Sequence, residues 1–286
     1  MGGGYFDDST YHSSRVTRAA AGIDDFDYTR NAKKIHASLD PKRIKDKPFH
    51  LLESRDNDGR LSTPIIVTFD VTGSNYENAK IAQAKLPELM AKLTAVCQNP
   101  QVAIWANDDV TVVGHNAIQL GEFESDNRID EAIRNVWLTG KGGGNDGESY
   151  DLLVFAAARK VVTDSLEKRA KRGYMFLYAD EPFFEEVNAK AVQNIFGDGL
   201  EKDIPIGDIV AEAQKKWNIF VIWPQNGYTH AREQYEELFG KDHVETLQAP
   251  ELLCDKVASM VAAQESAAAE NLAMAVADTE FTTRVV

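Results

Sequence analysis

The sequence predicts an α/β fold with a doubly wound, mostly parallel six-stranded sheet and helices on both of its faces. Three observations lead to this prediction. Short apolar runs alternate along the chain with helical patterns that have one apolar face. The runs are apolar at consecutive positions, as in strands that are covered on both sides. Two of the runs end at an aspartate, Asp70 and Asp180, and ligands of such folds bind at the carboxyl ends of the strands.

The individual elements follow from the same patterns. Apolar and β-branched runs predict strands at 65–69, 102–106, 110–113, 174–179, 218–223 and 244–247. A hairpin-like turn at 107–109 joins the second of these strands to the third. Apolar residues at intervals of three and four predict helices at 79–96, 126–137, 150–162 and 250–263. Pro87 lies inside the first helix and has no backbone N–H, so we expect a kink near residues 85–86.

The chain divides into three parts on composition. Residues 1–60 show no sustained period and are expected to form a partly irregular N-terminal arm, with a short helix at 29–39 that stops before Pro41. Residues 61–263 form the predicted α/β domain, with an insertion at about 182–207. The Ala-rich tail, 264–286, is expected either to extend the last helix or to fray.

Charge and composition exclude several functional classes. The chain has 286 residues and a formal net charge of −14, and the acidic excess lies after residue 60. A field of this sign opposes binding of nucleic acid or anionic lipid by the main body. No run approaches the about 20 apolar residues of a membrane helix, and the N-terminus lacks the apolar core of a signal peptide. Cys97 and Cys254 are too few for a disulfide framework, so we expect a cytoplasmic protein.

Oxygen-bearing side chains gather at one predicted rim of the sheet. They come from the loop after the first strand, from a glycine-rich loop and from the end of a later strand: Asp70, Thr72, Ser74, Asn145, Asp146 and Asp180. The alternate spacing in the first loop lets its three side chains turn inward together. Carboxylate, hydroxyl and amide oxygens suit Mg²⁺, Mn²⁺ or Ca²⁺ better than zinc. The sequence therefore predicts a divalent-cation site, with Mg²⁺ as the first expectation.

The run Asp70-Val71-Thr72-Gly73-Ser74 resembles the metal-ion-dependent adhesion site of the von Willebrand factor A domain family, Asp-x-Ser/Thr-x-Ser. The resemblance covers about residues 62–263. The family completes the site with a Thr or Asp in a second loop and an Asp in a third, and Asp180 matches the third-loop position.

The second loop departs from the commonest family pattern. The run Gly142-Gly143-Gly144-Asn145-Asp146-Gly147-Glu148 is similar to a Gly-Gly-Gly-Asp-x-x-Glu variant of some intracellular members. That alignment makes Asn145 the ligand position and leaves Asp146 as a near alternative. The resemblance implies that the bound ion keeps one position open for an acidic side chain of a partner protein.

Aromatic side chains near this edge are candidates for a partner-binding rim: Tyr76, Phe183, Phe184 and Tyr228. The alternative for Phe183 and Phe184 is packing in the core.

Three functions remain open on the sequence. The first is a metal-dependent protein-binding module, an adaptor or assembly factor that captures a partner's Asp or Glu. The second is a structural or assembly component with a vestigial metal site. The third is a metal-dependent phosphohydrolase, which has little support because no acid/base pair or nucleophile motif is present. We therefore expect a protein that is not an enzyme.

Overall fold

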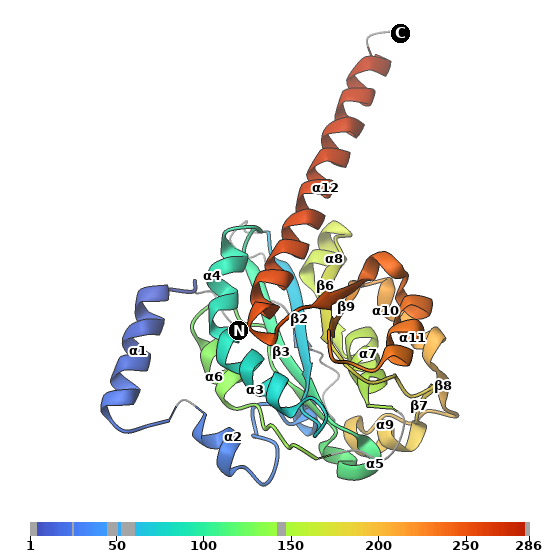
Figure 1. The fold of residues 1–286 in the computed structure, drawn as a ribbon. Coiled ribbons are helices and arrows are strands. Elements are labelled where there is room, and N and C mark those ends of the chain that lie inside the picture. The colour runs from blue at the N-terminus through green and yellow to red at the C-terminus, as the bar shows by residue number, and fades with distance from the viewer. Residues whose placement is uncertain (1–4, 25, 45–50, 53–60, 142–146, 284–286) are drawn as a thin grey trace.

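A central sheet of six strands organises the molecule in the computed structural model, which describes residues 5–24, 26–44, 51–52, 61–141 and 147–283 (Figure 1). In spatial order its strands are β10 (Val244–Leu247), β9 (Trp217–Pro224), β6 (Gly173–Tyr178), β2 (Thr63–Asp70), β3 (Pro100–Asn107) and β4 (Ile118–Leu120). All neighbours pair in parallel except β3 and β4. The predicted mostly parallel six-stranded sheet is therefore confirmed.

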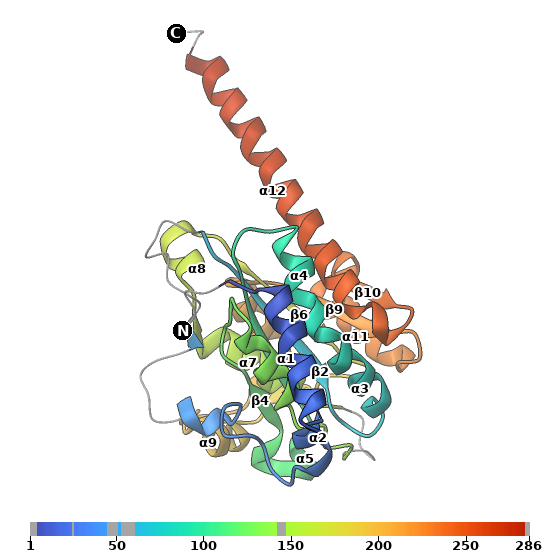
Figure 2. The same cartoon turned by 90° about the vertical axis from the view of Figure 1, so that its left-hand side faces the viewer.

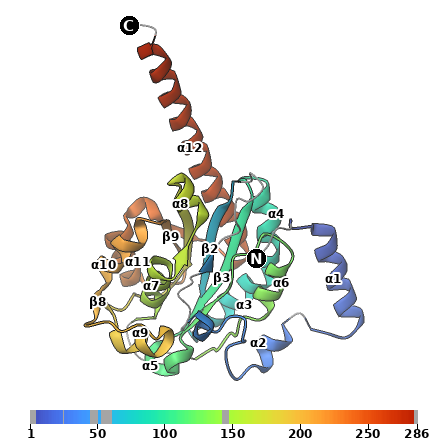
Figure 3. The ribbon, with the colours of Figure 1, turned by 180° about the vertical axis from the view of Figure 1, so that it is seen from behind.

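Helices cover both faces of this sheet (Figure 3). One face carries α7 (Tyr150–Arg159), α9 (Ala189–Phe196), α10 (Ile206–Gln214) and α11 (Thr229–Phe239). The other carries α3 (Tyr76–Lys85), α4 (Leu89–Thr94), α6 (Arg128–Arg134) and the start of α12 (Leu253–Thr283). Consecutive residues of β2 face opposite layers, Ile66 toward the first and Ile65 and Val67 toward the second. This two-sided burial explains why the strand has no polar face.

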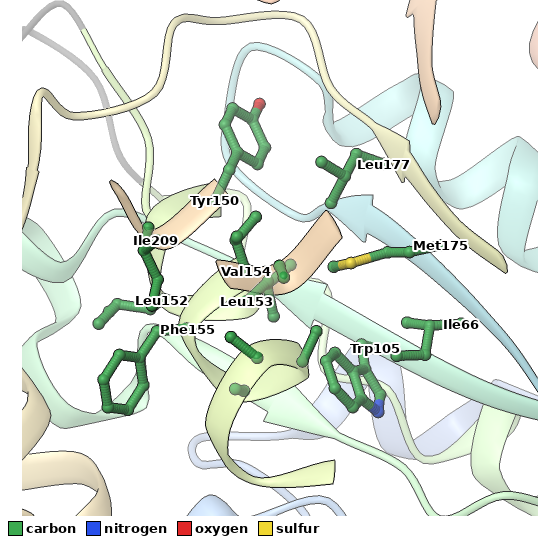
Figure 4. Packing of buried hydrophobic residues seen from close by; sticks show 14 of the residues in the cluster. Ile66, Trp105, Tyr150, Leu152, Leu153, Val154, Phe155, Met175, Leu177 and Ile209 are labelled. Carbon is green, nitrogen blue, oxygen red and sulfur yellow. The ribbon is translucent and has the colours of Figure 1, made fainter. Parts of the chain in front are cut away.

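Helix α7 is the most deeply packed helix of the first layer. Every residue from Tyr150 to Ala158 is buried, among side chains of the sheet such as Trp105, Met175 and Leu177 (Figure 4). Apart from Asp151 the buried part of this helix is apolar on all sides, and such a helix is stable only when it is covered on all sides, here by the sheet, α9 and α10. Burial of each large apolar side chain contributes about 1.5–3 kcal/mol. The packing holds the first residue of α7 rigidly at the carboxyl edge of the sheet.

The third predicted strand, 110–113, is wrong. Val110–Val113 forms a short helix, α5, and the strand that pairs with β3 is β4, a few residues later. Asp109 caps α5, because its Oδ1 accepts the backbone N–H of Thr111 at 2.7 Å. The cap outweighs the β-propensity of the valines. The sequence did not predict strand β4, because it has only three residues and the central one, Gln119, is polar. The Gln119 side chain is buried because it forms hydrogen bonds with the backbone N–H and carbonyl of Trp137.

The predicted kink at Pro87 is confirmed as a break. Helix α3 ends at Lys85, a 3-10 turn spans Leu86–Glu88, and α4 begins at Leu89. The predicted helices at 126–137 and 150–162 are shorter in the structure, and the second is followed by the two-residue strand β5 (Val161–Val162) and α8 (Asp164–Arg169). The C-terminal tail extends the last helix: α12 continues to Thr283 and projects from the body (Figure 1).

The N-terminal arm is more helical than its sequence suggested. It contains α1 (Asp8–Ala20), α2 (Asp27–Asn31) and a 3-10 turn, η1 (Pro41–Ile44), so the predicted helix at 29–39 is wrong. The arm is attached along α6, where Arg18 pairs with Asp130 at 3.1 Å (Figure 2). Leu39 is buried and its carbonyl accepts the N–H of Leu120, which ties the arm to the edge of the sheet.

The segment between β6 and α10 has its own structure. Strands β7 (Glu186–Val187) and β8 (Ile204–Pro205) pair antiparallel on either side of α9. The other short elements are β1 (Leu51–Leu52), which pairs with β5, and the 3-10 turns η3 (Gly114–Asn116), η4 (Lys241–His243) and η5 (Pro250–Leu252). No helix in the described part of the chain is both long and apolar enough to cross a membrane.

Candidate functional site at the carboxyl edge of the sheet

Strands β2 and β6 bring Asp70 and Asp180 together. The chain runs from β2 outward to β3 and β4, then returns to β6 and continues outward on the other side, so the sheet changes direction between β2 and β6. Such a switch point leaves a crevice at the carboxyl ends of the strands. Phe69 pairs with Tyr178 in the parallel register, and each aspartate follows shortly after. The two residues predicted as ligands from separate strands therefore do meet.

The hydroxyl of Tyr150 links the two carboxyl groups. It donates to Asp70 Oδ2 at 2.5 Å and lies 3.4 Å from Asp180 Oδ1, and the backbone N–H of Asp180 points back to the same hydroxyl at 3.3 Å. Figure 4 shows the Tyr150 ring at the margin of the apolar cluster, with its oxygen directed away from it. The sequence pattern gives no sign of this role, because a tyrosine at the start of an apolar helix has the pattern of any other core residue.

The loop after β2 presents two hydroxyls beside these carboxyls. Asp70 Oδ1 accepts the backbone N–H of Thr72 at 2.7 Å, and the Thr72 and Ser74 hydroxyl oxygens are 3.2 Å apart. Asp70 and Thr72 are buried, whereas Ser74 is exposed. The site is thus closed on the side of the sheet and open to solvent at Ser74.

A second segment packs on this loop through its backbone. The N–H of Gly73 donates to the carbonyl of Lys141 at 2.6 Å, and the N–H of Gly140 donates to the carbonyl of Val71 at 3.0 Å. Two backbone hydrogen bonds to residues 140 and 141 therefore tie down the loop that carries the two hydroxyls. Asn145 and Asp146, the predicted ligands of the second loop, lie outside the described residues.

The buried carboxyls carry an electrostatic cost. Burial, followed by the proximity of Asp180, raises the pKa of Asp70 well above its usual range. Burial also raises the pKa of Asp180, although the Ser74 hydroxyl partly offsets this. The groups with the largest effects on these two pKa values are acids, hydroxyls and backbone amides, with no basic side chain among them. A positive charge at this position would relieve the cost.

Glu148 adds a third buried carboxyl near the site. It is 1% exposed, its Oε2 has no hydrogen-bond partner among the described residues, and its N–H donates to the carbonyl of Pro182 at 2.9 Å. Burial, and after it the charge of Asp70, raises the pKa of Glu148 to about 11. In the sequence, Glu148 stands out only as the acid at the end of the glycine-rich run. Its burial near Asp70 depends on the tertiary fold.

The four proposed rim aromatics occupy different environments. Tyr228 is 49% exposed, and its backbone N–H donates to the carbonyl of Asp180 at 3.0 Å, so it lies at the mouth of the site. Tyr76 is half-buried against Gly140, and Phe184 is half-buried against Gly147. Phe183 is buried at 2% exposure. Its assignment to the rim is therefore wrong, and the core alternative holds for this residue.

Phe183 packs in the core against the residues that form the site. Its ring centroid lies 5.3 Å from that of Tyr150 and 5.9 Å from that of Tyr235. It helps to hold the loop after Asp180 on the core, because its N–H and carbonyl also bond the side chain of Gln234. An apolar side chain at this position fixes the loop, so it contributes to the geometry and not to a surface.

The residues present fit a hard divalent cation. All side chains assembled at the crevice offer oxygen, two of them as carboxylates, which is the donor set that Mg²⁺ and Ca²⁺ prefer. Within the described residues, no three or more His, Cys, Asp or Glu side chains lie close enough to hold a metal ion between them. A cation at this edge would therefore need the hydroxyls of Thr72 and Ser74 in addition to Asp70 and Asp180.

Comparison with known proteins supports the fold class. No family model matches the sequence, and no curated protein matches it. The structure is similar to the pilus adhesin SpaC from Lactobacillus rhamnosus GG in its open conformation, with a TM-score of 0.50 and 11% identity over 73% of this chain and 31% of the adhesin. A von Willebrand factor type A protein from Catenulispora acidiphila matches with a TM-score of 0.43 and 13% identity, over 70% of this chain and 42% of that one.

This chain therefore spans less than half of the length of either solved protein. At such identities the likeness concerns the fold alone. The six-stranded, mostly parallel sheet with helices on both faces is a doubly wound, Rossmann-like α/β fold, as the sequence predicted.

Proposed function

We propose that this protein is a metal-dependent protein-binding module. A divalent cation, Mg²⁺ in the first instance, would be held by Asp70, Thr72, Ser74 and Asp180, and by Asn145 or Asp146 from the second loop. The observation that carries the proposal is the pair of buried carboxyls beside two hydroxyls at an edge open to solvent. Nothing in a purely structural role requires two acids to be buried together, because the arrangement costs stability.

The chemistry of recognition follows from the charges. Two carboxylates and neutral hydroxyls leave a bound divalent ion with open coordination and with the capacity to attract another anion. The ion would supply a Lewis-acidic attachment point for an Asp or Glu side chain of a protein partner. Ser74 and the exposed Tyr228 stand at the mouth, where a partner's neighbouring residues would make contact. Binding of this kind needs no bond to be broken, so we propose that the protein is not an enzyme.

A second candidate function rests on one specific feature. Helix α12 projects well beyond the body, and α1 lies along the outside on the far side of α6 (Figures 1 and 2). Extended helices of this kind suit a component that joins other subunits in a larger assembly. In that case the cation site would be vestigial. We place either role in the cytoplasm, which agrees with both cysteines being free thiols.

Calorimetry separates these two functions. Mg²⁺, Mn²⁺ and Ca²⁺ are titrated into the wild type, into Asp70→Asn and into Asp242→Asn, an exposed carboxylate in η4 that serves as the matched control. We expect saturable binding by the wild type and by the control, and at least tenfold weaker binding by Asp70→Asn. Absence of binding by the wild type would remove the metal-dependent mechanism and leave the assembly role.

Copurification tests the protein partner. Tagged wild type and Asp70→Asn are recovered from the native source with Mg²⁺ and with a chelator. A partner retained only by the wild type, and only with Mg²⁺, is the expected result. Partners that remain bound in chelator and to Asp70→Asn favour the assembly role instead. Turnover of a phosphoester panel that Asp180→Ala abolishes would contradict the proposal that the protein is not an enzyme.

A further inference from the structure

A cavity of about 460 Å³ lies beside the candidate site, between α5, the first turn of α7, β7 and α9. Apolar walls come from Val110, Phe184, Ala191 and Ile195. Pockets of about 300–1,000 Å³ with mostly apolar walls and a few polar groups are typical of sites for small organic ligands. The proposed cation site does not use this cavity.

One buried carboxyl faces the cavity from the first turn of α7. Asp151 is 2% exposed and lines the cavity, and its Oδ1 has no hydrogen-bond partner among the described residues. Backbone amides of Asp151 and Leu152 interact with this carboxyl, as expected for an acid at a helix N-terminus. Those amides account for one oxygen of the carboxyl group but not for Oδ1, which has no partner among the described residues. A buried acceptor without a hydrogen bond costs about 1–3 kcal/mol.

The other charged residues of the cavity do not compensate Asp151. Three acids line it, Asp151, Glu186 and Asp203, against one basic residue, Lys190. Asp203 is already engaged, because its two oxygens accept from the side chain of Asn188 at 3.3 Å and from the backbone N–H of Ala189 at 2.8 Å. Glu186 is exposed, so water screens its charge. Asp151 is thus the acid whose environment most favours a new donor.

We propose that this cavity binds an organic cation, an ammonium or guanidinium group on an apolar arm, with the charged group against Asp151 and the arm against Phe184 and Ile195. A charged donor would give the unpartnered Oδ1 a hydrogen bond of the strong, charge-assisted kind. It would also supply the positive charge that the buried carboxylate lacks. Burial raises the pKa of Asp151 to about 8, and a bound cation would lower that pKa again, because it stabilises the ionised form of the carboxyl.

The cavity has a direct structural connection to the carboxyl edge of the sheet. Tyr150 and Asp151 are consecutive residues of α7; the first bonds Asp70, and the second faces the cavity. Phe184 lines the cavity and packs against Gly147, at the end of the second loop. The organic-cation site does not need the metal ion, so the two proposals succeed or fail separately.

Titration by NMR, in chelator and without metal, tests the proposal. The full chain carries a ¹³C label on its aspartate carboxyl carbons, and the probes are phenethylammonium and agmatine. We expect saturable shifts of the carboxyl carbons of Asp151 and of Asp203, the other aspartate that lines the cavity and the reporter in Asp151→Asn. The neutral analogue phenethyl alcohol should bind at least tenfold more weakly. Asp151→Asn should lose at least tenfold in affinity, and the exposed control Asp242→Asn should not change.

Three outcomes of this titration would overturn the organic-cation proposal. Equal binding of the amine and the alcohol, or unchanged affinity in Asp151→Asn, overturns the proposal. Failure of both amines to produce a saturable shift in the wild type overturns it as well, and this measurement does not depend on the variant being folded. A capped alanine pentapeptide with a central lysine distinguishes the sources of the cation. If it competes with phenethylammonium, a basic side chain of a protein suffices; if only the free amines bind, the ligand is a small molecule.

Discussion

Replacement of Asp70 by asparagine should stabilise the metal-free protein while removing its response to Mg²⁺. The hydrogen bonds at the site survive this change. Asparagine Oδ1 still accepts the N–H of Thr72, and its amide donates to the Tyr150 oxygen. Tyr150 then donates to Asp180, whose Oδ1 already lies 3.4 Å away. The substitution therefore removes one buried negative charge and keeps the hydrogen bonds to Thr72 and Tyr150.

The size of the effect follows from the separation of the two acids. Asp70 Oδ2 and Asp180 Oδ1 lie 2.5 and 3.4 Å from the same Tyr150 oxygen, which places them within about 6 Å of each other. Two unit charges at about 6 Å repel by about 3 kcal/mol at an effective dielectric constant of about 20. Because burial and Asp180 raise the pKa of Asp70 above its unfolded value, this penalty is absent at low pH and grows as the pH rises.

Thermal unfolding in chelator at several pH values provides the assay. For a chain of this size about 3 kcal/mol corresponds to a rise in Tm of about 6 °C, and the gain should vanish below about pH 4. Mg²⁺ at about 100 times its Kd should stabilise the wild type by about 2.7 kcal/mol and leave Asp70→Asn unchanged. A metal-free variant that is less stable than the wild type at neutral pH would refute the electrostatic reasoning.

Three further predictions follow from the same structure. Tyr150→Phe removes the donor to Asp70, so urea unfolding in chelator should show a loss of about 2 kcal/mol that shrinks in saturating Mg²⁺. Asp151→Asn removes an acid whose pKa in the folded protein is raised to about 8. The free energy of unfolding of the variant, relative to that of the wild type, should therefore rise between about pH 4 and pH 8, by about 6 kcal/mol at most. Urea unfolding curves at each pH measure this difference. Phe183→Ala should cost about 3–5 kcal/mol and Tyr228→Ala less than about 0.5 kcal/mol, measured as urea midpoints.

Each of these predictions has a contradicting outcome. A Tyr150→Phe deficit of the same size with and without Mg²⁺ would mean that no ion reaches Asp70. Parallel pH profiles for Asp151→Asn and the wild type would show that Asp151 ionises normally in the folded protein. If Phe183→Ala kept full stability but lost a partner, Phe183 would belong to the binding surface after all.

The sequence alone determined the features that depend on local pattern. A buried strand needs a run of apolar residues, so β10 was predicted at its observed bounds and β2 was located by the run that ends at Asp70. The break at Pro87 follows from a missing N–H, which is a property of the residue itself. Because parallel strands present their carboxyl ends at one edge, the meeting of Asp70 with Asp180 could also be predicted.

The tertiary structure decided what depends on neighbours far away in the chain. Val110–Val113 has the composition of a strand, but it forms a short helix whose first residue, Val110, donates its N–H to the Ser149 hydroxyl at 2.8 Å. Tyr150 looked like a core residue until the packing of α7 directed its hydroxyl between two acids. The sequence left Phe183 open to either the rim or the core, and the packing of its loop onto Tyr235 placed it in the core. Sequence patterns encode which residues seek burial; the partners that they meet there, and the charges left uncompensated beside them, are set only when distant segments pack together.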